Sequence, residues 1–346
     1  MLQVSNFDIL IAKDFSGHRI DWLKYLLIQS KNKGNSFLII CKDSSRIHDL
    51  LGDLLDPIYM LRFSGKLDTF EELLSDSSQH NIMFWDADQS LFFLLNARFH
   101  ARCLIMRPYL TEFRTKSFFN YAIKMLLISL LIFKKKHEIR LLSIPGASPM
   151  IFKKHWVEDT LILDNSRFNK TKDMRNEGTL SIVIPGYITL RKNPQHAIDA
   201  CIELRRSLGI EVNLDFLGSM EANVLSEIQL EKYPWIRINN FYLERQEYLK
   251  NLALADLVLL PYSNRGSSGI VMETLALGGI VAIYKNRHWK HLAAIASGQL
   301  ILIRRGARGI VAAVKQRLAM NAHECNPIIR EKANPTALEF LIQIEK

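Results

Sequence analysis

The residues best suited to chemistry stand in a short stretch of small residues followed by a carboxylate. Ser267, Ser268 and Gly269 follow the strand-like run 256–261 and precede an apolar run that contains Glu273. A strand, a small-residue loop and a helix place backbone N–H groups and the positive end of a helix dipole where they can bind phosphate. Glu273, near the start of that helix, could reach a ribose. The pattern predicts a nucleotide-dependent enzyme.

A second loop carries two cations. Gly186 follows the apolar run 180–185, and Arg191 and Lys192 stand shortly before Pro194, which suits the first turn of a helix. Ligands bind beyond the carboxyl ends of the strands in open α/β sheets, so both loops are expected at one edge of a sheet. Two cations there could neutralise a diphosphate. The alternative is a solvated basic turn.

Both loops need a parallel sheet to position them. Strand-like apolar runs alternate with helical patterns in each half of the chain: 7–12, 36–41, 82–85 and 102–106, then 180–185, 212–217, 257–260 and 280–283. This alternation predicts an α/β protein whose two halves each contain a sheet. The expected domains are 1–170 and 171–325, joined through the polar stretch 164–178. A last helix within 326–346 could cross back to the first domain.

Composition agrees with a folded protein of two domains. The chain has 346 residues, of which 48% are hydrophobic and 23% charged. Its four cysteines lie far apart without a C-x-x-C pair, which disfavours a zinc site or a disulfide framework and suits a reducing compartment. The first residues show no secretory signal pattern. We expect a cytoplasmic location.

The net charge of +10 is concentrated in one segment. Residues 98–140 include ten Lys or Arg and only two acids, which leaves this segment with a net charge of +8. Such a patch binds anionic partners: a membrane, a nucleic acid or a phosphorylated substrate. Nucleic acid is disfavoured because the patch is rich in aliphatic residues and carries no recognised binding motif.

Within that segment, residues 115–136 combine an apolar stretch with basic flanks. The apolar run 125–133 is followed by three lysines and is too short to span a bilayer, which takes about 20 residues. The pattern predicts an amphipathic helix lying in the interface of an anionic membrane, at its inner face, with Leu127 and Leu131 toward the lipid. The alternative is a helix buried against the sheet.

Taken in order, the motifs of the second half resemble those of a group 1 glycosyltransferase, a family-4 enzyme of the GT-B fold. The matching residues are Gly186, Arg191-Lys192-Asn193, Asp215-Phe-Leu-Gly218, Asp256-Leu-Val-Leu-Leu-Pro261 and the stretch from Ser267 to Gly278. The resemblance implies an α/β protein with two Rossmann-like domains that face each other across a cleft. It further implies transfer of a sugar from a UDP- or GDP-sugar to a saccharide or lipid-linked acceptor, usually with retention, and without a cofactor or metal.

The resemblance also implies roles for individual residues. Glu273 would bind the ribose of the donor, and Lys192 and Arg191 would hold the phosphates and stabilise the leaving group. The remaining donor contacts would come from Gly186, Ser267, Ser268 and Gly269, and from Gly17 and His18 in the first half. His18 could also take part in catalysis, and Arg107 could contact an anionic acceptor.

One residue departs from the family pattern. Many relatives carry a glutamate eight residues before the ribose-binding one, and this chain has Arg265 there. Arg265 is available for a further phosphate contact or for an acidic sugar. The departure keeps open a binding or scaffold protein that has lost catalysis, and a GT-B nucleotide-sugar epimerase is another alternative. Asp86 and Asp88 form a D-x-D pattern that could hold a metal, but a role in shaping the site wall is expected instead.

Overall fold

The structure is a computed structural model, and it divides the chain into two compact units that meet in the sequence at residues 162 and 163. The description covers residues 7–11, 23–24, 26–27, 36–41, 58–62, 81–106, 115–143, 152–158, 178–228, 232–241, 243–262, 268–286, 289–296 and 298–320. The expected boundary at 170/171, the helix within 326–346 and all of the expected linker except Gly178 lie outside these residues.

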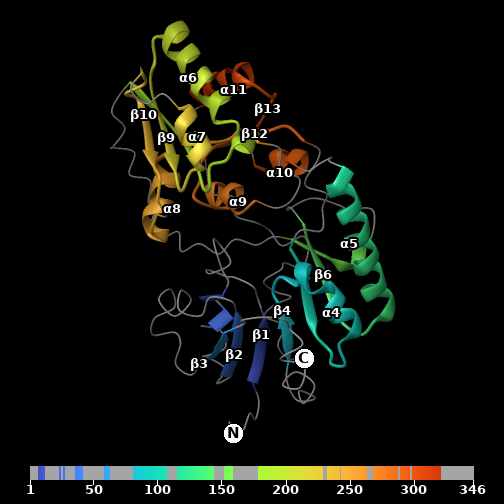
Figure 1. Ribbon diagram of the computed structural model, residues 1–346. Coiled ribbons are helices and arrows are strands. Elements are labelled where there is room, and N and C mark those ends of the chain that lie inside the picture. Colours follow the sequence, from blue (N-terminus) through green and yellow to red (C-terminus); the bar gives the residue numbers. More distant parts are fainter. Residues whose placement is uncertain are drawn as a thin grey trace. The chain divides into compact units, whose positions relative to one another are not determined.

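The first unit contains a parallel sheet of seven strands in the order β3-β2-β1-β4-β5-β6-β7 (Figure 1). The strands are β1 (Phe7–Ile11), β2 (Ser36–Cys41), β3 (Ile58–Arg62), β4 (Ile82–Phe84), β5 (Arg102–Ile105), β6 (Glu138–Ser143) and β7 (Trp156–Glu158). The four strands predicted from apolar runs are confirmed. Strand β6 escaped prediction because charged residues alternate with apolar ones at its start.

The first unit contains two helices, α4 (Leu91–Asn96) and α5 (Thr115–Lys134), that pack against each other. The inner side of α5 buries Leu127, Ile128 and Leu131 in the core of this unit. The expectation that Leu127 and Leu131 face lipid is therefore wrong, because these side chains cover the sheet. Among the residues with described structure, no helix has the length and apolar character needed to cross a membrane.

The second unit contains a parallel sheet of six strands in the order β10-β9-β8-β11-β12-β13. The strands are β8 (Thr179–Pro185), β9 (Glu211–Leu217), β10 (Ile236–Asn239), β11 (Leu257–Leu260), β12 (Val281–Tyr284) and β13 (Leu300–Ile303). From β8 the chain proceeds to β9 and β10 on one side, and it then crosses to β11 on the other. The carboxyl ends of β8 and β11 therefore flank the switch point of the sheet, where ligands bind in such folds.

Helices surround this second sheet: α6 (Pro194–Leu208), α7 (Ala222–Glu227), α8 (Arg245–Leu254), α9 (Gly269–Ala276), α10 (Trp289–Ile295) and α11 (Ala307–Ala319). The inward face of α6 follows from the helical spacing of its apolar residues, and Ala197, Ile198, Cys201 and Leu204 are all buried in the core.

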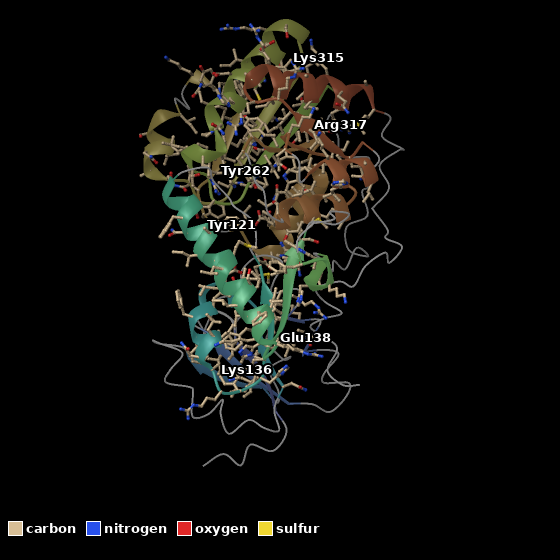
Figure 2. The ribbon with its side chains drawn as sticks, turned by 90° about the vertical axis from the view of Figure 1, so that its right-hand side faces the viewer. Tyr121, Lys136, Glu138, Tyr262, Lys315 and Arg317 are labelled. Carbon is tan, nitrogen blue, oxygen red and sulfur yellow. The ribbon has the colours of Figure 1, made fainter. Side chains whose placement is uncertain are left out.

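A side-chain contact of Arg317, which is labelled in Figure 2, connects α11 to the sheet. Arg317 donates from Nε to the Asp256 carbonyl at 3.0 Å, and the Asp256 carboxylate accepts the Ser181 N–H at 3.0 Å. Asp256, one of the residues that carry the resemblance, thus joins α11, β8 and the start of β11. This role is structural.

Candidate functional site

The loop after β8 folds back on its own strand. Gly186 leaves β8 with φ +83°, a left-handed conformation that favours glycine. The Lys192 side chain is buried, and its Nζ donates to the Pro185 carbonyl at 2.6 Å. A Cβ on Gly186 would lie 3.1 Å from Lys192 Nζ and 3.3 Å from Ile270 Cδ1. Gly186 therefore leaves room for the ammonium beside the first turn of α9.

The two cations of this loop meet an aromatic ring from the loop after β11. The guanidinium of Arg191 lies 6.0 Å, and Lys192 Nζ 5.6 Å, from the centroid of the Tyr262 ring. The Tyr262 hydroxyl is hydrogen-bonded to the side chain of Ser268, the N-cap residue of α9. Arg191, Lys192 and the beginning of α9 are thus gathered around one ring. The prediction that both loops lie at the same sheet edge is confirmed.

Burial and the nearby Arg191 charge lower the pKa of the Lys192 ammonium to about 7. The charged form is disfavoured because the group has lost water and lies near another cation. A bound phosphate would favour the charged form of Lys192.

A hydrogen bond and a close backbone approach fix the loop after β8 from both sides. Asn193, with φ +45°, donates from Nδ2 to the Pro261 carbonyl at 2.7 Å and so ties the loops after β8 and β11 together. On the other side, Gly186 N donates to the Leu217 carbonyl at 2.8 Å. A Cβ on Gly218 would lie 2.9 Å from Gly186 O, so Gly218 is the residue that permits this approach.

Glu273 does not stand alone on α9. It is 3% exposed, and its Oε1 lies 2.7 Å from Nη1 of Arg245 at the start of α8. The Tyr248 hydroxyl is also hydrogen-bonded to Glu273, and burial together with the Glu273 charge raises the pKa of Tyr248. Sequence reasoning missed Arg245 and Tyr248. Their spacing of three residues puts both on one side of α8, but this spacing does not predict that they contact Glu273.

Several predicted site residues lie outside the described residues: Gly17, His18, Arg107, Arg265 and Ser267. Strand β1, which precedes Gly17 and His18 in the sequence, lies between β2 and β4 at the switch point of the first sheet. Predicted residues that the structure brings together are Gly186, Arg191, Lys192, Ser268 and Gly269, and Glu273 lies further along α9.

The two aspartates of the D-x-D pattern, Asp86 and Asp88, form hydrogen bonds and an ion pair within the first unit. Asp86 accepts a hydrogen bond from the Asp88 N–H at 3.4 Å, and Asp88 accepts the Met106 N–H at 2.7 Å and forms an ion pair with Lys124. Asp88 thereby joins the loop after β4 to β5 and α5. In the described part of the chain, no cluster of His, Cys, Asp and Glu is arranged to hold a metal ion.

Comparison with family models and with curated protein sequences found no match. Solved structures do match the fold. HepE of Anabaena, solved with UDP and glucose, has a TM-score of 0.64 at 12% identity, covering 94% of this chain and 92% of its own. WaaG, a glycosyltransferase involved in lipopolysaccharide biosynthesis, has a TM-score of 0.61 at 12% identity, covering 91% and 90%.

A putative UDP-N-acetylglucosamine 2-epimerase from Listeria monocytogenes has a TM-score of 0.55 at 13% identity, covering 95% of this chain and 93% of its own. Likeness at such low identity establishes the fold and leaves activity to the site itself. With its two parallel sheets and their helices, the chain has the GT-B fold of two Rossmann-like domains.

Proposed function

We propose that the protein is a glycosyltransferase that moves a sugar from a nucleotide diphosphate sugar to a saccharide or lipid-linked acceptor. The observation that carries this proposal is the meeting of Arg191, Lys192, Tyr262 and the start of α9 at the switch point of the second sheet. The fold is shared with HepE, a structure solved with UDP and glucose, which supports a UDP-sugar donor. A GDP-sugar fits the same phosphate chemistry.

In this proposal the diphosphate lies between the cations and the first turn of α9. Transfer breaks the bond between the sugar C1 and the diphosphate oxygen and forms a bond from C1 to the acceptor hydroxyl oxygen, whose proton passes to the departing diphosphate. The departing diphosphate gains negative charge, and Lys192 and Arg191 stabilise that charge. Ser268 and Gly269 would contribute the helix N-terminus, and Glu273 would bind the ribose. Retention of configuration is part of the proposal.

The acceptor side is proposed for the first unit, with Arg107 as a contact and His18 in catalysis, and Gly17, Arg265 and Ser267 are proposed as further donor contacts. We also propose that the enzyme is cytoplasmic and peripheral on the inner face of a membrane, where it takes part in polysaccharide or glycolipid synthesis. The net charge of +8 over residues 98–140 supports that location. No cofactor or metal is needed for the proposed chemistry.

Binding of UDP, GDP and their sugars, measured by titration calorimetry, tests the donor site. Lys192→Ala should weaken binding at least about tenfold, since it removes a charge-assisted contact to phosphate. Lys315→Ala is the matched control, because Lys315 is an exposed lysine on α11 of the same unit (Figure 2). A folded wild-type protein that binds none of these nucleotides would contradict the proposal.

The likeness to an epimerase fold favours one alternative reaction, interconversion of nucleotide sugars. An epimerase converts its nucleotide sugar without any acceptor, whereas a transferase releases the nucleoside diphosphate and glycosylates an acceptor. Analysis of the sugar products, with and without acceptor, separates the two. Nucleotide binding with neither product would instead favour the scaffold protein.

A further inference from the structure

The outward side of α5 carries large apolar side chains where a surface helix normally has polar ones. Phe119, Leu126, Leu130 and Phe133 are 65%, 60%, 41% and 84% exposed. Their spacings of seven, four and three residues put them on one side of the helix. These four residues, here called the α5 ridge, extend along about 20 Å of helix.

The opposite side of the same helix is the one that packs on the sheet. Leu127, Ile128 and Leu131 are buried there, and Lys124 turns toward Asp88 of the same unit. The core side of α5 is therefore complete without the ridge. The four ridge residues are not members of that core, and a line of exposed apolar side chains of this kind indicates a further contact.

Positive charge gathers at the carboxyl end of the ridge. Lys134 Nζ donates to the Leu95 carbonyl at 3.1 Å, and Lys136 Nζ donates to the Ala97 carbonyl, so these lysines close the end of α4. Arg98, which follows α4, and Lys135, which follows α5, are exposed. Lys134 and Lys136 donate to neutral carbonyls, so these contacts do not cancel their positive charge.

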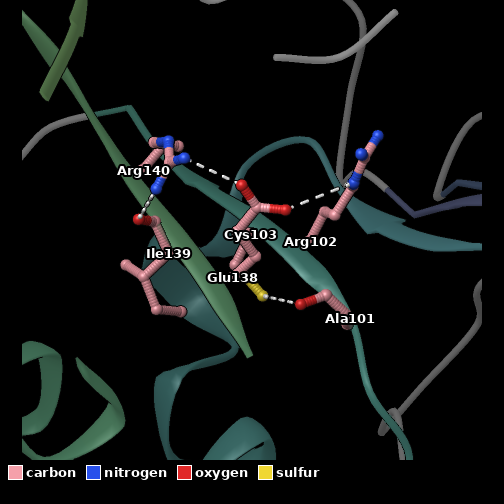
Figure 3. Close-up of polar contacts among 6 residues, drawn as sticks. All are labelled: Ala101, Arg102, Cys103, Glu138, Ile139 and Arg140. Carbon is pink, nitrogen blue, oxygen red and sulfur yellow. Dashed lines mark hydrogen bonds and ion pairs between the residues drawn. The ribbon is translucent and has the colours of Figure 1, made fainter. Parts of the chain in front are cut away.

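Nearby acids do not offset these cations. Glu138 lies 2.9 Å from Arg140 Nη2 and 3.5 Å from Arg102 Nε (Figure 3). Asp88 forms its ion pair with Lys124. Glu138, the one acid among residues 115–143, and the Asp88 carboxylate are thus already paired with other cations.

We infer that the α5 ridge enters the interface of an anionic membrane, with the helix lying flat and Lys134–Lys136 against the lipid headgroups. Helices that lie at a membrane interface typically have an apolar side and flanking basic residues, and α5 has both. The inference deepens the proposed membrane location and names the side chains that make contact. It does not depend on the donor site.

Sedimentation with vesicles of phosphatidylcholine, alone or mixed with phosphatidylglycerol, tests the ridge. Leu126→Ser with Phe133→Ser should lower the affinity for the mixed vesicles at least about tenfold. The matched control is Leu254→Ser with Leu318→Ser, which removes leucines that are 47% and 46% exposed on α8 and α11. Binding to mixed vesicles should also weaken as salt concentration rises.

Two results would overturn the membrane assignment. One is equal loss of vesicle binding in the ridge and control variants. The other is a dimer in solution that the ridge variant dissociates, because that would make a second copy the occupant. Nucleotide binding should be unchanged in the ridge variant, so a failure of the proposed donor site is seen separately.

A different observation, the ion pair of Glu273 with Arg245, carries a second inference. We propose that Arg245 and Tyr248 are positioning residues that fix Glu273 and thereby set a preference for ribonucleotides over 2′-deoxyribonucleotides. A buried carboxylate without a cation tends to take up a proton, and it then loses acceptor capacity for sugar hydroxyls. The contact at 2.7 Å places a cation beside Glu273 and holds one of its oxygens in place.

This second inference rests on the proposed function, and its test compares UDP with 2′-deoxy-UDP. Wild type should prefer UDP about tenfold, as expected for a hydrogen bond to a charged group. Arg245→Met and Tyr248→Phe should each shrink this ratio, whereas Arg245→Lys should restore most of it. Arg237→Met, which removes an exposed arginine of β10, should leave it unchanged.

The ratio of the affinities for UDP and 2′-deoxy-UDP separates a positioning role from general destabilisation, because a weakened fold lowers both affinities together. An unchanged ratio in Arg245→Met and Tyr248→Phe, with UDP still bound, would overturn the positioning role alone. Absence of UDP and GDP binding to wild type would overturn the proposed function as well.

Discussion

At the residue scale, the site depends on a few side chains that would be unfavourable outside their surroundings. Lys192 is a buried cation beside a second cation, and Glu273 is a buried carboxylate. Lys192 contacts the Pro185 carbonyl, seven residues away, and the distant Tyr262 ring, and Glu273 is paired with the distant Arg245. Such compensated groups are typical of binding sites.

Lys192 should make nucleotide binding dependent on pH. Its pKa is about 7 in the folded protein, so the ammonium loses its proton as the pH rises above 7. A bound diphosphate favours the charged form, so binding should take up a proton in this range. We expect the affinity for UDP to fall on the order of tenfold between pH 7 and pH 9.

Calorimetry in two buffers of different ionisation enthalpy measures that proton uptake. Lys192→Met should abolish both the uptake and the added pH dependence. A pH-independent affinity in wild type would contradict this view of Lys192.

Lys192 also affects the stability of the fold. Between pH 7 and the usual pKa of lysine, the unfolded chain binds more protons than the folded one, so the contribution of Lys192 to the free energy of unfolding rises with pH in this range.

Gly218 should be far less replaceable than Gly209. Gly218 has φ +131° and a would-be Cβ contact of 2.9 Å with Gly186 O, whereas Gly209 has φ +61° and open space around it. Gly218→Ala should lower the free energy of unfolding by about 2–3 kcal/mol or more and weaken nucleotide binding through the displaced loop. Gly209→Ala should cost about 1 kcal/mol and leave binding intact. Urea unfolding measures both, and equal losses would show that the backbone approach is unimportant.

At the element scale, α5 is a helix with apolar side chains on both its inner and its outer side. The same segment that the sequence marks as apolar divides into an inner side in the core and an outer ridge. Hydrophobicity alone identified the segment. The sheet beneath it decided which leucines were inside.

Leu130 and Leu131 are neighbours in the sequence, but replacing them should change the free energy of unfolding by very different amounts. Leu131 is 1% exposed and belongs to the core, whereas Leu130 is part of the ridge. Leu131→Ala should lower the free energy of unfolding by about 2–5 kcal/mol because it leaves a cavity. Leu130→Ala should change it by about 0.5 kcal/mol or less. Denaturant unfolding tests the pair, and similar losses would mean that α5 is buried on both sides.

At the scale of the whole molecule, the two units have hydrophobic cores that share no described residue. Lys192 and Glu273, proposed to bind the donor, belong to the second unit, and the α5 ridge belongs to the first. The proposed nucleotide site and the proposed membrane contact therefore depend on different cores, and substitutions in one unit should leave the function proposed for the other unchanged.

Scanning calorimetry should show this separation as two transitions. UDP should raise only the transition of the second unit, since a ligand stabilises the structure to which it binds. Leu131→Ala should lower only the other transition. A single transition that responds to both changes would show that the units unfold as one.

The sequence by itself determined the α/β class, most strands, α6 and α8, and the pairing of a basic loop with a small-residue helix start. These are local patterns: apolar runs, helical spacing and glycines at strand ends. Strand β6 was missed because its charged residues, Glu138 and Arg140, interrupt the apolar run. The residue-level resemblance to glycosyltransferases likewise rested on short motifs in order.

Only the tertiary structure decided which side of α5 is buried, that Asp88 pairs with Lys124, and that Arg245 and Tyr248 meet Glu273. The physical reason is shared by all three. A side chain's burial and its charge partner depend on which surface the fold brings against it. Asp88 and Lys124 are 36 residues apart in the chain, and Glu273 lies 28 residues from Arg245 and 25 from Tyr248. Local pattern sets which elements form, and packing between distant elements sets what their side chains touch.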